Sequence, residues 1–262
     1  DKNMRIPLYQ IDAFADRPFS GNPAAVCPLD SWLDDDVMQN MAMENNLSET
    51  AFFVGADGKY DLRWFTPASE VDLCGHATLA SAHVVFNRLE TTQDKIVFST
   101  KSGDLVVTRQ GDLIEMDFPA RAPEAMKENP ALLAALGGNP TSAQVSRDFF
   151  VTYETEAEVA ALTPDMAALA SLENWAIIVT APGDHCDFVS RFFAPGHGID
   201  EDPVTGSAHC TLIPYWSDRL GKDQMIARQI SARGGELHCR NQGDRVAIAG
   251  RAHEVLVGEF LL

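Results

Sequence analysis

The sequence lacks an excess of basic residues. Its 262 residues include 20 lysines and arginines against 38 aspartates and glutamates, which gives a formal net charge of −18 at pH 7. Nucleic-acid binders need a basic surface that displaces counterions from phosphates, and anionic membrane surfaces attract basic segments. We therefore expect no nucleic acid and no membrane surface as a partner, and we assign most of the acidic residues to solubility.

Cysteines are few and long apolar runs are absent. The five cysteines are odd in number, widely spaced and without a C-x-x-C pair, which argues against a disulfide framework and for a reducing compartment. No apolar run approaches the roughly 18 residues that a membrane-spanning helix needs. The first residues also lack the charged-then-apolar pattern of a signal peptide. The sequence therefore predicts a cytoplasmic protein.

Cofactor and metal motifs are missing as well. No G-x-G-x-x-G follows an expected strand and no P-loop motif occurs, so neither a dinucleotide nor ATP is indicated. The pairs Cys74-x-His76 and His209-Cys210 offer soft ligands, but neither has a usual zinc spacing. We expect no cofactor and no bound metal.

The sequence instead repeats itself once. Residues 63–67 (RWFTP) recur as residues 191–195 (RFFAP), and residues 74–77 (CGHA) are answered by residues 205–208 (TGSA). A third match joins residues 99–112 to residues 231–244, which share a serine, a glycine and a Gln-Gly-Asp sequence at corresponding positions. Three matches in the same order predict a duplicated unit.

The expected elements follow the same order in both halves. Each half has an acidic helix, an apolar strand, the arginine-aromatic strand and a helix that opens at Gly75 or Gly206. Thr163 is the expected N-cap of the acidic helix in the second half, and Pro214 is expected to kink or restart the helix that contains it. The expected ranges are 33–45 and 164–172 for the acidic helices, 51–54 and 176–179 for the apolar strands, and 95–98, 105–108 and 113–118 for the strands that close the first half.

This pattern predicts an α+β fold of two pseudo-symmetric α/β domains, each a mixed or antiparallel sheet around a central helix. We expect the domains at residues 4–121 and 122–262, with the last strand, about 254–262, packed onto the first. Ligand sites commonly lie between such halves. The helix starts at Gly75 and Gly206 offer small residues, free N–H groups and the positive end of a dipole, which suit a carboxylate. Alternatively, the two glycines only permit close helix packing.

Five ordered motifs resemble the phenazine-biosynthesis (PhzF-like) isomerase family. They are residues 21–26 (GNPAAV), 46–50 (NLSET), 65–67 (FTP), 74–77 (CGHA) and 202–208 (DPVTGSA). The resemblance runs from Met4 to the C-terminus and implies the diaminopimelate epimerase fold. It also implies a cofactor-independent isomerase that acts on a small, carboxylate-bearing substrate, and it allows a homodimer.

The resemblance implies Glu49 as the catalytic acid–base, with His76, Asp202 and Ser207 around the substrate. Glu49 directly precedes an apolar strand, and aligning the apolar runs gives Asn174 as its counterpart in the second half. The acid is thus unique to the first copy, as an asymmetric site requires. The further residues expected to bind substrate are Asn22, Cys74, Gly75, Ala77, Thr205 and Gly206.

Two alternatives remain open at this point. In the two-cysteine racemases and epimerases of this fold a thiol begins each central helix, but here Cys74 is matched by Thr205, whose hydroxyl has a pKa far above that of a thiol. A cysteine-dependent epimerase would need another partner for Cys74, which we expect to be a small buried residue. The second alternative is a non-catalytic binding or regulatory protein that keeps the fold.

Overall fold

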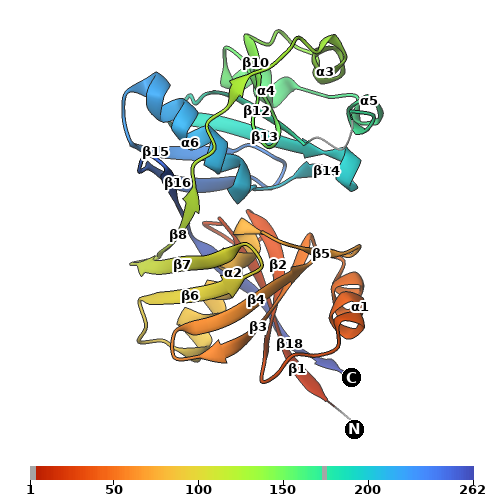
Figure 1. The fold of residues 1–262 in the computed structure, drawn as a ribbon, viewed down its shortest axis with the longest axis vertical. Helices are drawn as coiled ribbons and strands as arrows, with labels where there is room; N and C mark the ends of the chain where they lie inside the picture. The colour runs from red at the N-terminus through yellow and green to blue at the C-terminus, as the bar shows by residue number, and fades with distance from the viewer. Residues whose placement is uncertain (1–3, 173–175) are drawn as a thin grey trace. The chain divides into compact units, whose positions relative to one another are not determined.

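The computed structural model describes residues 4–172 and 176–262, which form two compact units (Figure 1). The first unit is built from residues up to Asp117 together with Ala249–Leu262, and the second is Phe118–Ile248. From the sequence we expect the boundary after residue 121. We also expect that, of the residues beyond it, only the last strand packs onto the first unit. The division instead falls a few residues earlier, and the chain returns to the first unit from Ala249 onwards.

The first unit is a mixed sheet. Strand β1 is antiparallel to β2 and β18, β2 is parallel to β3, β3, β4 and β5 are antiparallel, β4 is parallel to β6, and β6, β7 and β8 are antiparallel. Its elements are β1 (Arg5–Ala13), β2 (Asn22–Leu29), α1 (Asp35–Asn45), β3 (Glu49–Ala56), β4 (Lys59–Phe65), β5 (Glu70–Val71), α2 (Gly75–Val84), the π-helical turn η1 (Val85–Leu89), β6 (Lys95–Thr100), β7 (Gly103–Gln110), β8 (Leu113–Pro119) and β18 (Ala252–Leu261).

The second unit repeats this order of pairing. Strand β10 is antiparallel to β11, β11 is parallel to β12, β12, β13 and β14 are antiparallel, β13 is parallel to β15, and β15 is antiparallel to β16. The predicted duplication is therefore confirmed. The elements are β9 (Glu124–Ala125), α3 (Pro130–Leu136), β10 (Ser142–Val145), β11 (Phe149–Thr152), α4 (Glu156–Ala161), α5 (Met166–Ala170), β12 (Ile177–Pro182), β13 (Phe188–Ala194), the 3₁₀ turn η2 (Pro195–His197), β14 (Ile199–Asp202), α6 (Gly206–Leu220), β15 (Gln224–Gln229), β16 (Gly235–Asn241) and β17 (Arg245–Gly250).

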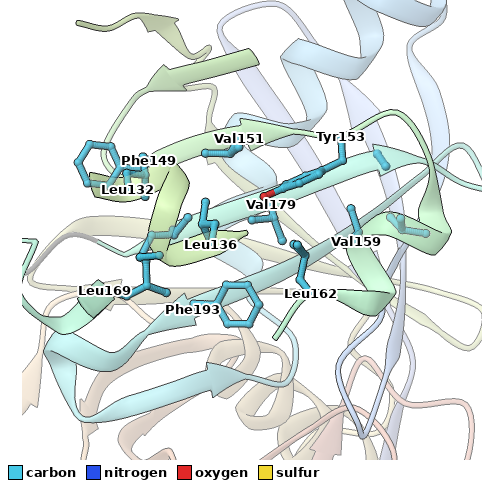
Figure 2. Packing of buried hydrophobic residues seen from close by; sticks show 14 residues of the cluster. Leu132, Leu136, Phe149, Val151, Tyr153, Val159, Leu162, Leu169, Val179 and Phe193 are labelled. Atoms are coloured by element: carbon cyan, nitrogen blue, oxygen red, sulfur yellow. The ribbon is translucent and has the colours of Figure 1, made fainter. Parts of the chain in front are cut away.

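Each unit contains a buried central helix. In α2 every residue except His83 is buried, because its sequence is small or apolar on all sides and such a helix belongs in a core. Nine residues of α6 are buried. Figure 2 shows a core cluster of the second unit, in which side chains from α3, α4 and α5 pack onto Val151, Val179 and Phe193 of the sheet. No helix of the described residues is long and apolar enough to cross a bilayer.

A repeated ion pair accompanies the repeated sequence. Arg63 of β4 bonds both carboxylate oxygens of Glu70 on β5, each at 2.8 Å. Arg191 of β13 bonds both oxygens of Glu201 on β14, at 2.8 and 2.9 Å. The arginine of the repeated segment thus joins the same two strands in both units through a planar, two-point contact.

Two details of the second unit differ from expectation. Helix α5 begins at Met166 and not behind Thr163, because the Asp165 side chain accepts a hydrogen bond from the Ala168 N–H at 3.0 Å and caps the helix there. Helix α6 passes through Pro214 without a break. Proline cannot donate to the Cys210 carbonyl one turn back, but that carbonyl accepts the backbone N–H of Arg121 at 2.8 Å, so the lost helical bond is replaced.

Candidate active site

Glu49 is the first residue of β3, an interior strand that pairs with β2 on one side and with β4 on the other. Helix α1 ends at Asn45, and the left-handed backbone of its C-cap residue Asn46 (φ 51°) turns the chain towards β3. Strand β3 then pairs in parallel with β2, with Glu49 opposite Ala24. The Glu49 side chain is 14% exposed, because the residues after it form an apolar, buried strand. The Glu49 carboxyl group is thus largely buried at the start of a core strand of the first unit.

His76 lies directly against Glu49. It is the second residue of α2 and is 4% exposed. Its Nε2 is 3.1 Å from Oε2 of Glu49, which is an ion-pair distance. The two groups are not aligned for a hydrogen bond, and neither atom has another hydrogen-bond partner among the described residues although both are buried. They therefore attract each other by charge and keep their hydrogen-bonding capacity for a third group.

Cys74 completes this cluster from the other side of the imidazole. It is the N-cap residue of α2, and its Sγ is 3.4 Å from Nδ1 of His76. Burial, with the charge of Glu49, raises the pKa of the thiol to about 11. Burial acts to lower the pKa of His76, but the neighbouring sulfur and carboxylate outweigh it and hold that pKa well above its ordinary value. Cys74 is therefore a protonated thiol at neutral pH, and the Glu49 carboxylate favours the charged form of the His76 imidazole.

The same three side chains offer metal-ligand atoms that lie within 4.8 Å of one another. The two ring nitrogens of His76, however, face different partners: Nδ1 faces the Cys74 sulfur and Nε2 faces the Glu49 carboxylate. A single ion takes only one nitrogen of an imidazole. The arrangement therefore favours a chain of polar contacts over a coordination sphere.

In the second unit the predicted residues surround the start of α6. Asp202 ends β14 and Thr205 is the N-cap of α6. The Thr205 hydroxyl donates to Oδ2 of Asp202 in a short hydrogen bond. Gly206 is buried and Ser207 half-buried on the first turn of the helix. The hydroxyl that replaces a second thiol is thus committed to a neighbouring carboxylate.

In both central helices the carbonyl of the N-cap residue accepts a hydrogen bond from the side chain four positions later. Thr78 Oγ1 donates to the Cys74 carbonyl at 2.6 Å, and His209 Nδ1 lies 2.8 Å from the Thr205 carbonyl. Burial lowers the pKa of His209 to about 4, so the ring is neutral and its Nδ1–H donates. The two helix starts are therefore fixed in the same manner by different residues.

The remaining predicted residues of the first unit are buried beside this cluster's elements. Asn22 is fully buried at the start of β2, and its Oδ1 lies 3.5 Å from the hydroxyl of Ser48, the residue before Glu49. Gly75 and Ala77 lie on the first turn of α2 and are buried. Gly75 and Ala77 therefore bring no polar side chain to the start of the helix.

At the position that the strand register makes equivalent to Glu49, the described part of the second unit has no acidic side chain. Asn174, its expected counterpart, lies outside the described residues. The strand register gives a different match: Arg63 pairs with Phe52 and Arg191 with Val179, and the residues three positions before these partners are Glu49 and Ala176. Ala176 is 4% exposed and apolar. By the strand register the residue equivalent to Glu49 is therefore an apolar alanine.

Gln229 and Ser231 are contacts of this region that the sequence did not indicate. Gln229, the last residue of β15, bonds both Asp202 and Thr205, and the Ser231 hydroxyl donates to the Pro203 carbonyl at 2.7 Å. Gln229 belongs to no motif, and Ser231 stands in the repeated segment only as the counterpart of Ser99. The parallel pairing of β15 with β13 brings them to the loop before α6, and no local pattern reveals such a pairing.

Comparison with known proteins identifies the family. Residues 11–258 match the model of the phenazine biosynthesis-like protein family, PhzC-PhzF. An uncharacterized isomerase of Pseudomonas aeruginosa is 53% identical over 259 residues, covering 99% of this chain and 100% of that protein. A human phenazine biosynthesis-like domain-containing protein is 40% identical over 289 residues, covering 97% of this chain and 99% of its own.

Solved structures agree with this assignment. The crystal structure of a PhzF-family protein from Enterococcus faecalis superimposes with a TM-score of 0.96 at 49% identity, covering 99% of this chain and 100% of that one. A hydroxyproline epimerase from Agrobacterium vitis has a TM-score of 0.62 at 11% identity over 98% of this chain and 93% of its own, which shows a shared fold alone. This chain therefore belongs to the phenazine biosynthesis-like (PhzF) family, and it is an isomerase.

Proposed function

We propose that this isomerase moves a proton on a small, carboxylate-bearing metabolite, with Glu49 as the acid–base group and without a cofactor. One observation carries the proposal: a buried Glu49 oxygen without a hydrogen-bond partner lies 3.1 Å from a buried His76 nitrogen that also has none. Buried polar groups in native proteins are nearly always satisfied, so a pair left open at one place points to a missing third group. A substrate is the group that fits.

The chemistry follows from the charges of the pair. The Glu49 carboxylate takes a proton from a substrate carbon, and the electron pair left on carbon moves into the adjacent π system. Glu49 then returns the proton at a different carbon, so atoms and charge balance over the cycle. Throughout, the His76 cation stabilises negative charge in its vicinity, whether on Glu49 or on the substrate.

The remaining roles rest on the family resemblance. The first turn of α2 has N–H groups without a helical partner, and these suit a substrate carboxylate. Asp202 and Ser207 are proposed to contact substrate, as the resemblance implies. Small residues at Gly75 and Ala77 support the first of these roles, because they let a ligand approach the helix backbone.

Deuterium incorporation tests the proposal. Wild type, Glu49→Gln and Glu44→Gln are incubated in D₂O with a panel of small cyclic and acyclic carboxylates, and solvent deuterium in each compound is followed by NMR. Glu44 lies exposed on α1 and provides the matched control. We expect wild type and Glu44→Gln to exchange alike, and Glu49→Gln to exchange about 10²–10⁴-fold more slowly. Equal exchange by Glu49→Gln and wild type would remove Glu49 from the mechanism.

A further inference from the structure

Gln229 uses its whole side-chain amide on the loop between β14 and α6. It is 1% exposed at the end of β15. Its Nε2 donates to the Asp202 carbonyl at 2.8 Å and to the Thr205 hydroxyl oxygen at 3.1 Å, and its Oε1 accepts the Thr205 backbone N–H at 2.8 Å. One buried amide thus joins the residue that ends the strand to the residue that begins the helix.

These bonds impose a direction on the polar contacts. Because the Thr205 hydroxyl oxygen accepts from Gln229, its own hydrogen is directed to Oδ2 of Asp202. The Thr205 carbonyl is occupied by His209. Every polar group of Thr205 is therefore committed, and the Asp202 carboxylate receives a donor whose orientation Gln229 sets.

The adjacent residues of the loop are held from the same strand end. Ser231 donates its hydroxyl to the Pro203 carbonyl, and the same hydroxyl oxygen accepts the Gly234 N–H at 3.1 Å. The loop from Asp202 to Thr205 is thus anchored from β15 and the turn after it. Of these anchors only Gln229 reaches the carboxylate-bearing residue.

We infer that Gln229 is a positioning residue, which holds the Asp202 carboxylate and the first turn of α6 in the geometry that the reaction needs. The inference rests on the proposed function, in which Asp202 contacts substrate. Both a donor and an acceptor are required at this position, at the reach of a glutamine side chain. A carboxylate there would accept the Thr205 N–H but could not donate to the Asp202 carbonyl or to the Thr205 hydroxyl oxygen.

The Gln229→Glu substitution gives a signature that a merely structural role would not produce. At high pH the introduced carboxylate lacks the donor, whereas at low pH its protonated form regains one O–H donor in nearly the same shape. We therefore expect exchange by Gln229→Glu to be about tenfold to a hundredfold below wild type at pH 8, and to recover relative to wild type as the pH falls towards 5. Gln224→Glu, at the exposed first position of the same strand, is the control and should follow wild type throughout.

The experiment measures deuterium exchange into the panel compound that wild type exchanges fastest, as kcat and KM across this pH range. Hydrogen–deuterium exchange of the protein backbone, read by mass spectrometry over residues 202–209, shows whether the loop loosens in step. Gln229→Glu with the kcat, KM and pH profile of wild type would overturn the inference. So would a loss of activity that does not recover at low pH while backbone protection does. Absence of exchange by wild type itself would instead contradict the proposed function, and the backbone measurement would still report whether Gln229 holds the loop.

Discussion

Cys74 begins the central helix of the first unit, where a catalytic thiol would begin it in a two-cysteine epimerase. Its environment does not activate it. The side chain is buried, and burial together with the Glu49 charge raises its pKa to about 11, so the reactive thiolate is scarce at neutral pH. The equivalent helix of the second unit begins behind Thr205, whose hydroxyl donates to Asp202. Both observations argue against the cysteine-dependent mechanism.

This environment predicts a slow reaction with alkylating agents. We expect Cys74→Ala to retain exchange activity within about tenfold of wild type, and iodoacetamide at pH 7 to inactivate the enzyme slowly. Cys186→Ala is the control, because Cys186 is half-buried and its pKa is also raised to about 11 by burial. Rapid inactivation that Cys74→Ala abolishes, together with loss of activity in that variant, would restore the epimerase mechanism.

At this scale the sequence predicted one half of the candidate site better than the other. Glu49, Cys74 and His76 stand in motifs, and the structure brings them into contact. Gln229 stands in none, since the pairing of Ser190 with Gln229 brings it to Thr205, which lies 24 positions earlier in the chain. Motifs identify residues with chemistry of their own, whereas a residue that acts by holding others is visible only once its partners are placed.

At the scale of elements, the ion pair between Arg63 of β4 and Glu70 of β5 is expected to contribute to stability. The hydrogen bonds from Arg63, with a further one from Lys101, hold the pKa of Glu70 at about 2. The side chain is 18% exposed, so water screens the pair only in part. Since the folded-state pKa lies below the unfolded one, the stabilisation is complete above the ordinary value of 4.5 and is lost as the pH falls towards 2.

Glu70→Gln is therefore expected to lower the free energy of unfolding by about 1–2 kcal/mol at pH 7. The deficit should shrink as the pH falls below 4.5, because wild type loses its own contribution there. Urea titrations at several pH values measure both quantities. Glu44→Gln, on an exposed face of α1, should differ little from wild type, and a Glu70→Gln deficit that stays constant with pH would argue against the ion pair as its cause.

Helix α6 contains a proline, Pro214, whose effect on the helix could not be predicted from the sequence. Strands 95–98, 105–108 and 113–118 were predictable because alternation and turn signals are local, and the structure has β6, β7 and β8 there. The effect of Pro214 was not predictable. Whether a proline breaks a helix depends on which group donates a hydrogen bond to the carbonyl one turn before it. Here the donor to the Cys210 carbonyl is the backbone N–H of Arg121, far away along the chain.

For the molecule as a whole, the point at which the chain re-enters the first unit is tightly packed. A Cβ on Gly250 would lie 2.4 Å from Cδ1 of Phe14, a ring that is 1% exposed. Strand β18 follows and pairs with β1 from Ala13↔Ala252 to Arg5↔Leu261. The junction therefore admits no side chain without displacing the core of the first unit.

Gly250→Ala is expected to lower the free energy of unfolding of the first unit by about 1–3 kcal/mol, because overpacking forces a buried ring to move. Gly258→Ala is the matched control within β18, since the nearest heavy atom to its added Cβ lies at 3.9 Å. That variant should change stability by less than about 1 kcal/mol. Differential scanning calorimetry of both variants checks the difference, and equal transitions for the two would contradict the packing argument.

The return of β18 to β1 also bears on the order in which the protein folds as it is made. The second unit is continuous in sequence, so it can fold as soon as residues 118–248 have left the ribosome. Most of the first unit is synthesised earlier, but it lacks the strand that pairs along the whole of β1 until Ala252–Leu261 emerge. During translation the unit that holds Glu49 and His76 therefore receives its final strand only after residues 118–248 have been made.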